Sequence, residues 1–193
     1  MRGFKLLALS AFSASFLSFT PINKKYIVID AGHGGNDTGS VYGNVSEKEI
    51  TINIAKEIKK FNENQDKYEV ILTRDSDTYP TLQERTAMIN KLNPEIVISL
   101  HMNSNPEKET PKQGTEVYIQ NTENSKKLAE KISKKFDVAK IEERNLHMLR
   151  ETKAPAVLVE LGFMNNTKER EYVTSEKGQK EIAQKFTDII REY

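Results

Sequence analysis

The sequence predicts a three-layer α/β domain, in which a central sheet of five or six strands lies between two layers of helices. Short apolar runs rich in β-branched residues alternate with longer segments whose apolar residues recur at helical spacing. This alternation is typical of α/β domains. The 193 residues suit one compact domain and leave no room for a second large one.

Three apolar runs have the composition of strands that are buried on both faces. Each passes into a short polar or glycine-containing loop, as expected of central strands. They cover residues 26–30 (YIVID), 95–100 (EIVISL) and 156–161 (AVLVEL). Further strands are predicted at residues 68–73 (YEVILT) and 116–119 (EVYI), and an edge strand at residues 145–149.

Four segments between and after these strands have the apolar spacing of amphipathic helices. Their apolar faces are formed by Ile50, Ile54, Ile58 and Phe61; by Leu82, Arg85, Ile89 and Leu92; by Leu128, Ile132 and Phe136; and by Ile182, Phe186, Ile189 and Ile190. The first two helices are preceded by capping boxes, Ser46-x-x-Glu49 and Thr81-x-x-Glu84. In this motif the hydroxyl and the carboxylate each satisfy a free backbone N–H group.

The first 20 residues have the layout of a secretory signal peptide. Arg2 and Lys5 precede an apolar, uncharged run from Leu6 to Phe19, which is short for a bilayer span. We therefore predict a secreted or periplasmic protein of the cell envelope, with residues 1–20 as leader and residues 21–193 as one domain. Because no clear small-x-small cleavage site follows the apolar run, an uncleaved membrane anchor is the alternative.

The composition excludes several classes of function. Without the leader, acidic and basic residues are nearly balanced, so no net charge attracts nucleic acid. The chain has no cysteine, which excludes disulfides, a thiolate nucleophile and cysteine-ligated zinc. A metal site would have to consist of histidine and carboxylate ligands.

Two of the three histidines directly follow predicted strands. His33 lies in the glycine-rich segment after the first strand, and His101 directly follows the strand predicted at residues 95–100. Ligand sites of open α/β sheets gather at the carboxyl ends of the strands. One such histidine would more often be a hydrogen-bonded loop residue, but two at matching strand ends favour a metal site.

A catalytic zinc site usually has three protein ligands and one open position, so a third donor is needed. Glu47 is the candidate because it lies three, seven and eleven positions before Ile50, Ile54 and Ile58 and so continues the buried face of that helix. Glu49 lies on a different face and already has a role in the capping box. The spacing therefore assigns different roles to two neighbouring acids.

Glu160 interrupts an apolar strand that is expected to be central, where an unpaired carboxylate is costly to bury. It could form a structural salt bridge with Arg150 or Arg85. It could instead be a general base with a raised pKa beside the metal. Two roles are possible for Asp30. It could accept a hydrogen bond that fixes the tautomer of a ligand histidine, or it could cap the turn after its strand.

Several segments, taken together, resemble N-acetylmuramoyl-L-alanine amidases of the amidase_3 family. In chain order they are IDAGHGGNDTGS, SEKEI, TRDSD, LQERTAMIN, ISLHMNS, GTEVYI and LRETKAPAVLVELGFMNN. The resemblance covers nearly all of residues 26–193. By position, the zinc ligands of the family fall on His33, Glu47 and His101, and its catalytic glutamate falls on Glu160. The resemblance also implies a mixed, mostly parallel sheet of about six strands.

The activity that this resemblance implies is zinc-dependent hydrolysis of the amide between N-acetylmuramic acid and L-alanine in peptidoglycan, in turnover or cell separation. The alternatives are a zinc peptidase or deacetylase that acts on another amide, and a non-catalytic, zinc-containing wall-binding protein. Peptidoglycan is the expected partner, and the membrane is contacted only through an uncleaved leader.

Three more residues and one short segment complete the sequence-based expectations. Asn103 and Arg150 flank the predicted site and could contact substrate or pack on the surface, and His147 is expected in a pocket wall or at an exposed edge rather than on the metal. Some similar amidases carry an inserted helix that blocks the zinc. Only about 36 residues separate Ile119 from Ala156 here, so we expect an open site that needs no activator protein.

Overall fold

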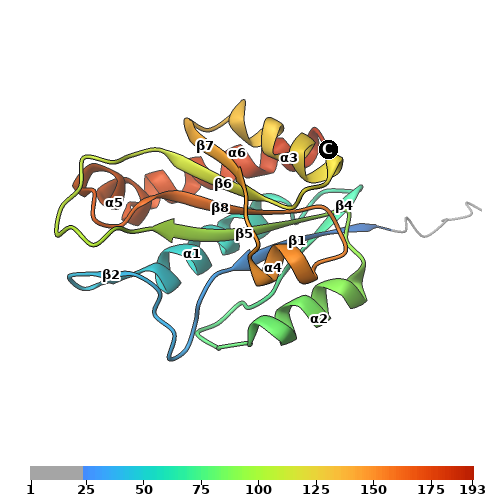
Figure 1. Ribbon diagram of the computed structural model, residues 1–193. Helices are drawn as coiled ribbons and strands as arrows, with labels where there is room; N and C mark the ends of the chain where they lie inside the picture. The colour runs from blue at the N-terminus through green and yellow to red at the C-terminus, as the bar shows by residue number, and fades with distance from the viewer. Residues whose placement is uncertain (1–23) are drawn as a thin grey trace, which may run out of the picture.

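The structure is a computed structural model that describes residues 24–193. The predicted leader, residues 1–20, lies outside these residues. A six-stranded sheet in the order β4-β1-β5-β8-β6-β7 forms the centre of the molecule (Figure 1). Its strands are β1 (Lys25–Ala31), β4 (Tyr68–Leu72), β5 (Ile96–Asn103), β6 (Thr115–Ile119), β7 (Val138–Glu143) and β8 (Ala156–Phe163).

The sheet is mixed and mostly parallel, as the resemblance implied. Strands β4, β1, β5 and β8 run in one direction, whereas β6 is antiparallel to β8 and parallel to β7. Ile27, Val28 and Ile29 of β1 have no solvent exposure, so this strand is covered on both faces. The central strands and their burial are therefore confirmed.

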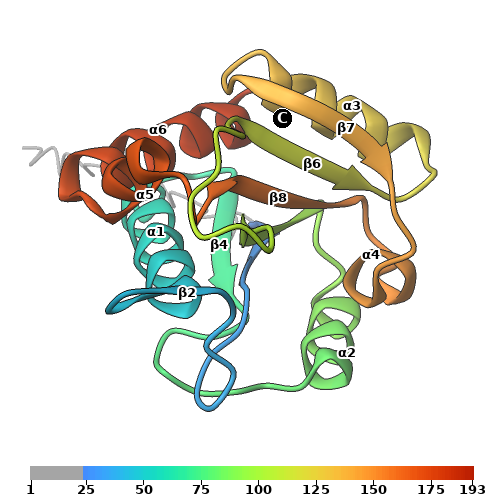
Figure 2. The same cartoon turned by 60° about the vertical axis from the view of Figure 1, so that its left-hand side comes forward.

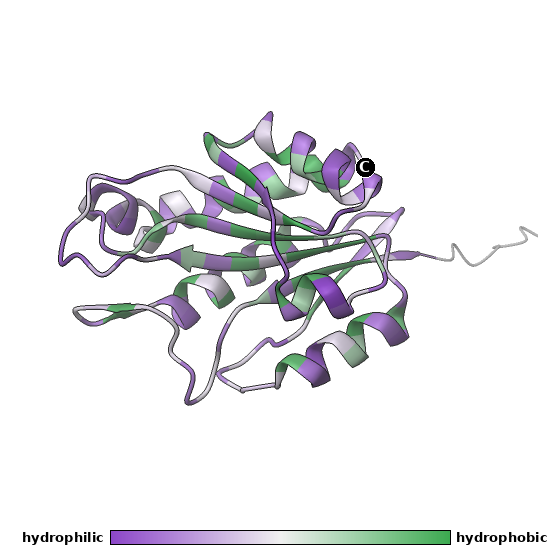
Figure 3. Ribbon diagram, viewed as in Figure 1, coloured by the Kyte–Doolittle hydropathy of each residue, from purple (hydrophilic) through white to green (hydrophobic). Residues whose placement is uncertain are grey.

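Helices cover both faces of the sheet. Figure 2 shows α1 and α6 on one side of it and α2 and α4 on the other. The larger core lies against α1 (Glu47–Phe61), α3 (Glu123–Ser133), α5 (Thr167–Thr174) and α6 (Glu176–Arg191). The smaller core lies against α2 (Leu82–Leu92) and α4 (His147–Glu151). Figure 3 shows hydrophobic residues concentrated along the strands between these layers.

The two predicted capping boxes are present. The carboxylate of Glu49 accepts hydrogen bonds from the hydroxyl (2.8 Å) and the backbone N–H (3.4 Å) of Ser46. The Glu84 carboxylate accepts from the backbone N–H of Thr81 at 2.7 Å, and the Thr81 hydroxyl accepts from the Glu84 N–H at 3.2 Å. Helices α1 and α2 thus begin where the sequence indicated.

The edge strand was predicted at the wrong segment. Residues 145–149 lead into and form most of α4, and the edge strand is β7 at Val138–Glu143. The side chains of β7 are partly or largely exposed, and the strand carries charges typical of a sheet edge, so it lacks the apolar run used to find strands. Met148 and Leu149 are buried against the smaller core from a short helix.

Two further elements were not predicted. Helix α5 has one buried residue, Val173, and therefore no apolar stripe. The hairpin of β2 (Val41–Tyr42) and β3 (Val45–Ser46) is too short for an alternating pattern. No helix among residues 24–193 is long and apolar enough to cross a membrane.

Candidate metal centre

Three side chains converge at the carboxyl ends of β1 and β5. His33 lies in the loop after β1, Glu47 is the first residue of α1, and His101 lies near the end of β5. Glu47 Oε1 is 3.0 Å from His33 Nε2 and 3.0 Å from His101 Nδ1. One ligand atom from each residue lies within 4.8 Å of the other two, so all three predicted ligands come together.

Glu47 is held by backbone donors as well as by the two histidines. Its Oε1 accepts a hydrogen bond from the Met102 N–H at 2.9 Å, and its Oε2 accepts one from the Ser40 N–H at 2.9 Å. Burial alone would raise the pKa of this 3% exposed carboxyl group, but the hydrogen bonds from His101 and His33 hold it well below its usual value. Glu47 is therefore an ionised, fixed acceptor.

His33 has an unusual backbone and a fixed ring. Its φ of 62° lies in the left-handed region, which a non-glycine residue occupies only when its surroundings hold it there. Its Nδ1 is 2.9 Å from Asp37 Oδ2, which leaves Nε2 directed to Glu47. Although burial opposes it, the hydrogen bonds with Glu47 and Asp37 raise the pKa of His33 to about 9.

Asp37 is the carboxylate that orients His33, one of the three candidate ligands, and the sequence interpretation did not identify it. The role was considered for Asp30, but Asp30 accepts hydrogen bonds from Arg85, Ser99 and Thr73 instead. The available signal was the spacing of His33 and Asp37, four residues apart in one glycine-rich loop. A loop has no periodicity from which that contact could be read.

Two arginines support the backbone of the His33 loop. Arg85 donates hydrogen bonds to the carbonyl oxygens of Ala31 (2.6 Å) and His33 (2.6 Å), and Arg74 donates to those of Ala31 (3.0 Å) and Gly32 (2.8 Å). Both side chains are buried. These bonds occupy three consecutive carbonyl groups, which explains how the strained conformation persists.

Glu160 lies beside the three ligands on the neighbouring strand. It pairs in register with His101 across β5 and β8. Its Oε2 atom is buried and has no hydrogen-bond partner, and burial raises the pKa of the carboxyl group to about 7. The suggested salt bridge is absent within residues 24–193: Arg85 pairs with Asp30, and Arg150 binds Glu151 and Asn145.

The chemistry and spacing of the three ligand residues fit a zinc ion. Two imidazole nitrogens and one carboxylate oxygen form a ligand set found in catalytic zinc sites. Ligand atoms placed tetrahedrally about 2.0–2.1 Å from zinc lie roughly 3.3 Å apart. The two separations from Glu47 Oε1 are 3.0 Å and approach this value, and all three ligand atoms lie within 4.8 Å of one another, so the cluster has the size of a zinc site.

A cavity of about 210 Å³ opens beside the two histidines. One wall is apolar and consists of Tyr79, Pro80, Leu82 and Met148. The side chains of His33 and His101 keep 22% and 19% of their surface exposed. The ligand residues are therefore accessible from this cavity. Asn103 has a different contact, because its Nδ2 donates to Glu116 Oε2 at 2.9 Å.

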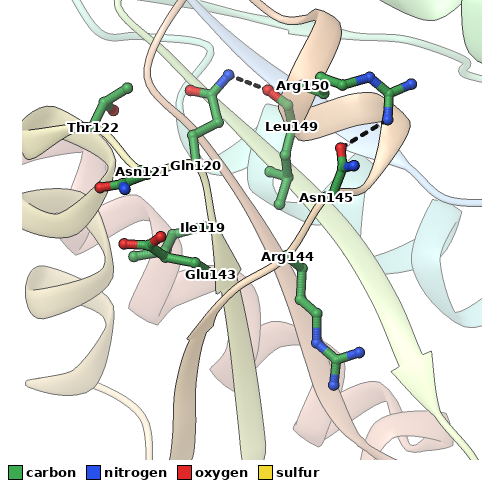
Figure 4. A pocket seen from close by; sticks show the side chains of 9 residues that line it. All are labelled: Ile119, Gln120, Asn121, Thr122, Glu143, Arg144, Asn145, Leu149 and Arg150. Atoms are coloured by element: carbon green, nitrogen blue, oxygen red, sulfur yellow. Dashed lines mark hydrogen bonds between the residues drawn. The ribbon is translucent and has the colours of Figure 1, made fainter.

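Arg150 lines a second cavity of about 490 Å³ that includes none of the predicted metal or catalytic residues. Figure 4 shows this cavity between the end of β6 and α4, where Arg150 points outward and bonds to Asn145. Strand β6 is antiparallel to β8, and its residue Glu116 is the register partner of Glu160. Its last residue, Ile119, lies three residues farther along β6, away from the metal centre. Arg150 thus does not flank the metal centre as expected. His147 is not one of the clustered ligands.

Comparisons with known proteins show the family to which the chain belongs. The family model described as N-acetylmuramoyl-L-alanine amidase (Amidase_3) matches residues 27–192. The chain is 32% identical to the probable cell wall amidase LytH of Staphylococcus saprophyticus over 182 aligned residues. This alignment covers 90% of this chain and 60% of LytH.

Solved amidase structures have the same fold. One is the catalytic domain of CwlV, an N-acetylmuramoyl-L-alanine amidase of Bacillus (Paenibacillus) polymyxa. It is 34% identical to this chain and superposes with a TM-score of 0.82, and the match covers 88% of this chain and 97% of that domain. The CwlD amidase of Clostridioides difficile, solved in complex with the GerS lipoprotein, is 27% identical with a TM-score of 0.80, over 88% of this chain and 98% of CwlD. The chain belongs to the Amidase_3 family of N-acetylmuramoyl-L-alanine amidases.

Proposed function

We propose that this protein is a zinc-dependent enzyme that hydrolyses the amide bond between N-acetylmuramic acid and L-alanine in peptidoglycan. The observation that supports this most directly is the position of Glu160. A buried carboxylate oxygen without a partner lies next to three convergent metal ligands, in a chain of the amidase family. Such an oxygen suits a group that exchanges protons with water and substrate.

His33, Glu47 and His101 would hold the zinc ion. When bound, zinc would polarise the amide carbonyl and lower the pKa of the attacking water. Glu160 takes the proton of the attacking water on its carboxylate, and the same carboxyl group returns the proton to the departing alanine nitrogen. The pKa of about 7 suits both steps, because the group can hold and release a proton near neutral pH.

Asp37, Arg74 and Arg85 would act through the metal ligands rather than on the substrate. Asp37 keeps the Nε2 of His33 directed to the metal position, and the arginines fix the loop that carries His33. Residues that orient metal ligands typically change metal affinity 10–100-fold when they are replaced.

Both alternative functions have less support. A peptidase or deacetylase could use the same ligands, but the matched family consists of muramoyl amidases. A wall-binding protein that keeps zinc for structure has no use for a free base such as Glu160.

We also propose action in the cell envelope without an activator protein. The residues between β6 and β8 form α3, β7 and α4, and both ligand histidines keep exposed surface beside the cavity. Purified protein should therefore be active alone. A large gain in rate on addition of an envelope lipoprotein, of the kind seen bound to CwlD, would contradict this part of the proposal.

The test of the function is a digestion of purified peptidoglycan followed by mass spectrometry. With zinc, the expected products are stem peptides with a free N-terminal alanine and glycan strands of unchanged length. Chelation should abolish the release, and zinc should restore it. Cleavage within the peptide, loss of acetyl groups, or zinc binding without any cleavage would support the alternatives instead.

A further inference from the structure

The register of three strands places Glu116 one strand beyond Glu160 on the same face of the sheet. His101 of β5 pairs with Glu160 of β8, and Glu160 pairs with Glu116 of β6. Side chains directly opposite each other on antiparallel strands lie on one face, with Cβ atoms about 5 Å apart. A substrate that extends from Glu160 toward β6 therefore meets Glu116 next.

Glu116 is held in position by two neutral donors. Its Oε2 accepts hydrogen bonds from Asn103 Nδ2 at 2.9 Å and from the Tyr118 hydroxyl at 2.7 Å. The ring of Tyr118 packs against the smaller core, and the guanidinium of Arg144 lies 5.0 Å from its centre. The orientation of the Glu116 carboxylate is therefore set by groups that are themselves held.

One oxygen of this carboxylate remains available. Among residues 24–193, no hydrogen bond engages Glu116 Oε1 and no cation pairs with the residue. Lys140, its register partner on β7, bonds instead to Glu142 at 2.6 Å. Glu116 is only partly buried, and its unbonded Oε1 keeps some exposed surface, so this atom can be reached from solvent. A carboxylate that is fixed but not paired is suited to accept a hydrogen bond from a ligand.

The two sides of the metal centre differ in chemistry. Toward α2 and α4 the cavity wall is apolar, with Tyr79, Leu82 and Met148, and suits the sugar ring and the lactyl group. Toward β6 the surface offers the unbonded Oε1 of Glu116, an acceptor that suits a peptide N–H group. Successive residues of an extended peptide advance about 3.3–3.6 Å, so the N–H after the scissile nitrogen falls between Glu160 and Glu116.

We propose that Glu116 binds the stem peptide by accepting, at Oε1, a hydrogen bond from the N–H of its second residue. Glu116 would thus make the enzyme prefer muramoyl peptides of two or more residues. This inference rests on the proposed amidase function and on the orientation of the peptide toward β6.

The test compares kcat/KM for three substrates: N-acetylmuramoyl-L-alanine, an N-acetylmuramoyl dipeptide, and that dipeptide methylated on the nitrogen of its second residue. For Glu116→Ala, kcat/KM on the dipeptide should fall about tenfold or more, as expected for the loss of a hydrogen bond to a charged group. The value for the other two substrates should change less than twofold. Glu116→Gln keeps an acceptor oxygen and should show a smaller loss.

A matched control is Glu69→Ala, which removes an exposed glutamate from β4 at the opposite side of the sheet. It should leave all three values unchanged. Bound metal and thermal stability should be the same in the Glu116 variants and the wild type.

Several outcomes would overturn the inference. Equal losses on the monopeptide and the dipeptide would mean that Glu116 acts through the fold or the charge of the site, and no loss on either would exclude substrate contact. A loss that grows when a disaccharide replaces the monosaccharide would assign Glu116 to a glycan hydroxyl. If the wild type cleaved none of these substrates, the amidase proposal itself would fail, which is distinguishable from these results.

Discussion

Arg85 Nη2 donates a hydrogen bond to the backbone carbonyl of His33 at 2.6 Å, so an arginine on α2 supports a metal-ligand loop after β1. The same side chain pairs with Asp30 at 2.7 Å. The contact with His33 holds the loop of the metal centre, whereas the pair with Asp30 stabilises the fold. Substitutions can separate the two.

Replacing Arg85 with lysine should weaken metal binding. A lysine keeps a positive charge for Asp30 but cannot also reach the carbonyl oxygens of Ala31 and His33. We expect zinc affinity to fall about 10–100-fold, as measured by competition with a chelating dye. Arg150→Lys, in the second cavity, is the control and should bind zinc normally. A folded Arg85→Lys protein with unchanged affinity would argue against support of the loop by Arg85.

Alanine substitutions at two glycines, one beside the metal centre and one away from it, test how tightly the ligand residues are packed. Gly39 and Gly43 have φ values of 62° and 59°, so alanine costs about 1–2 kcal/mol of backbone strain at either position. A Cβ at Gly39 would lie 2.5 Å from Glu47 Oε2 and 2.7 Å from His33 Cδ2, whereas one at Gly43 meets nothing within 4 Å. Gly39→Ala should therefore displace two ligands.

The measurement is zinc affinity together with the free energy of unfolding for both variants. Gly43→Ala should lose only the strain energy, and Gly39→Ala should in addition bind zinc at least tenfold more weakly. Similar zinc affinities for the two proteins would mean that the loop relaxes around the added methyl group.

The Asp30–Arg85 pair should make stability depend on acid pH. Burial would raise the pKa of Asp30, but the charge of Arg85 and the hydrogen bonds from Ser99 and Thr73 lower it overall. A carboxyl group with a lowered folded-state pKa stabilises the protein above its unfolded pKa of about 4, and this contribution is lost as pH falls through the folded-state pKa.

Urea unfolding between pH 7 and pH 3 tests this dependence. Asp30→Asn should lower the free energy of unfolding by about 3–5 kcal/mol at pH 7, because it leaves Arg85 buried without its partner. The variant should also show a flatter decline between pH 5 and pH 3 than the wild type. Parallel curves for the two proteins would show that other carboxyl groups cause the acid sensitivity.

The sequence was informative wherever periodicity reflects burial. Buried strands such as β1 and β8 are continuous apolar runs, and Glu47 could be identified because a helix repeats every 3.6 residues. The edge strand β7 and helix α5 escaped detection because most of their side chains are exposed and their patterns are polar.

The sequence predicted which residues form the candidate site but not the hydrogen bonds that hold them in place. The three ligands and Glu160 come together as expected, because strand ends and one helix face determine their places. Contacts made by loops depend on backbone conformations such as the left-handed φ of His33, which no periodic pattern encodes. For this reason Asp37 was missed and Asp30 was considered for its role.

The most direct test of the account is the rate of muramoyl-alanine amide cleavage by zinc-loaded Glu160→Gln protein. Glutamine has a similar size but cannot take a proton from water. We predict that the variant binds as much zinc as the wild type and cleaves 10²–10⁴-fold more slowly, which is the usual contribution of a general acid–base group. A zinc-loaded variant that retained a rate within a few-fold of the wild type would contradict the role of Glu160 and the mechanism built on it.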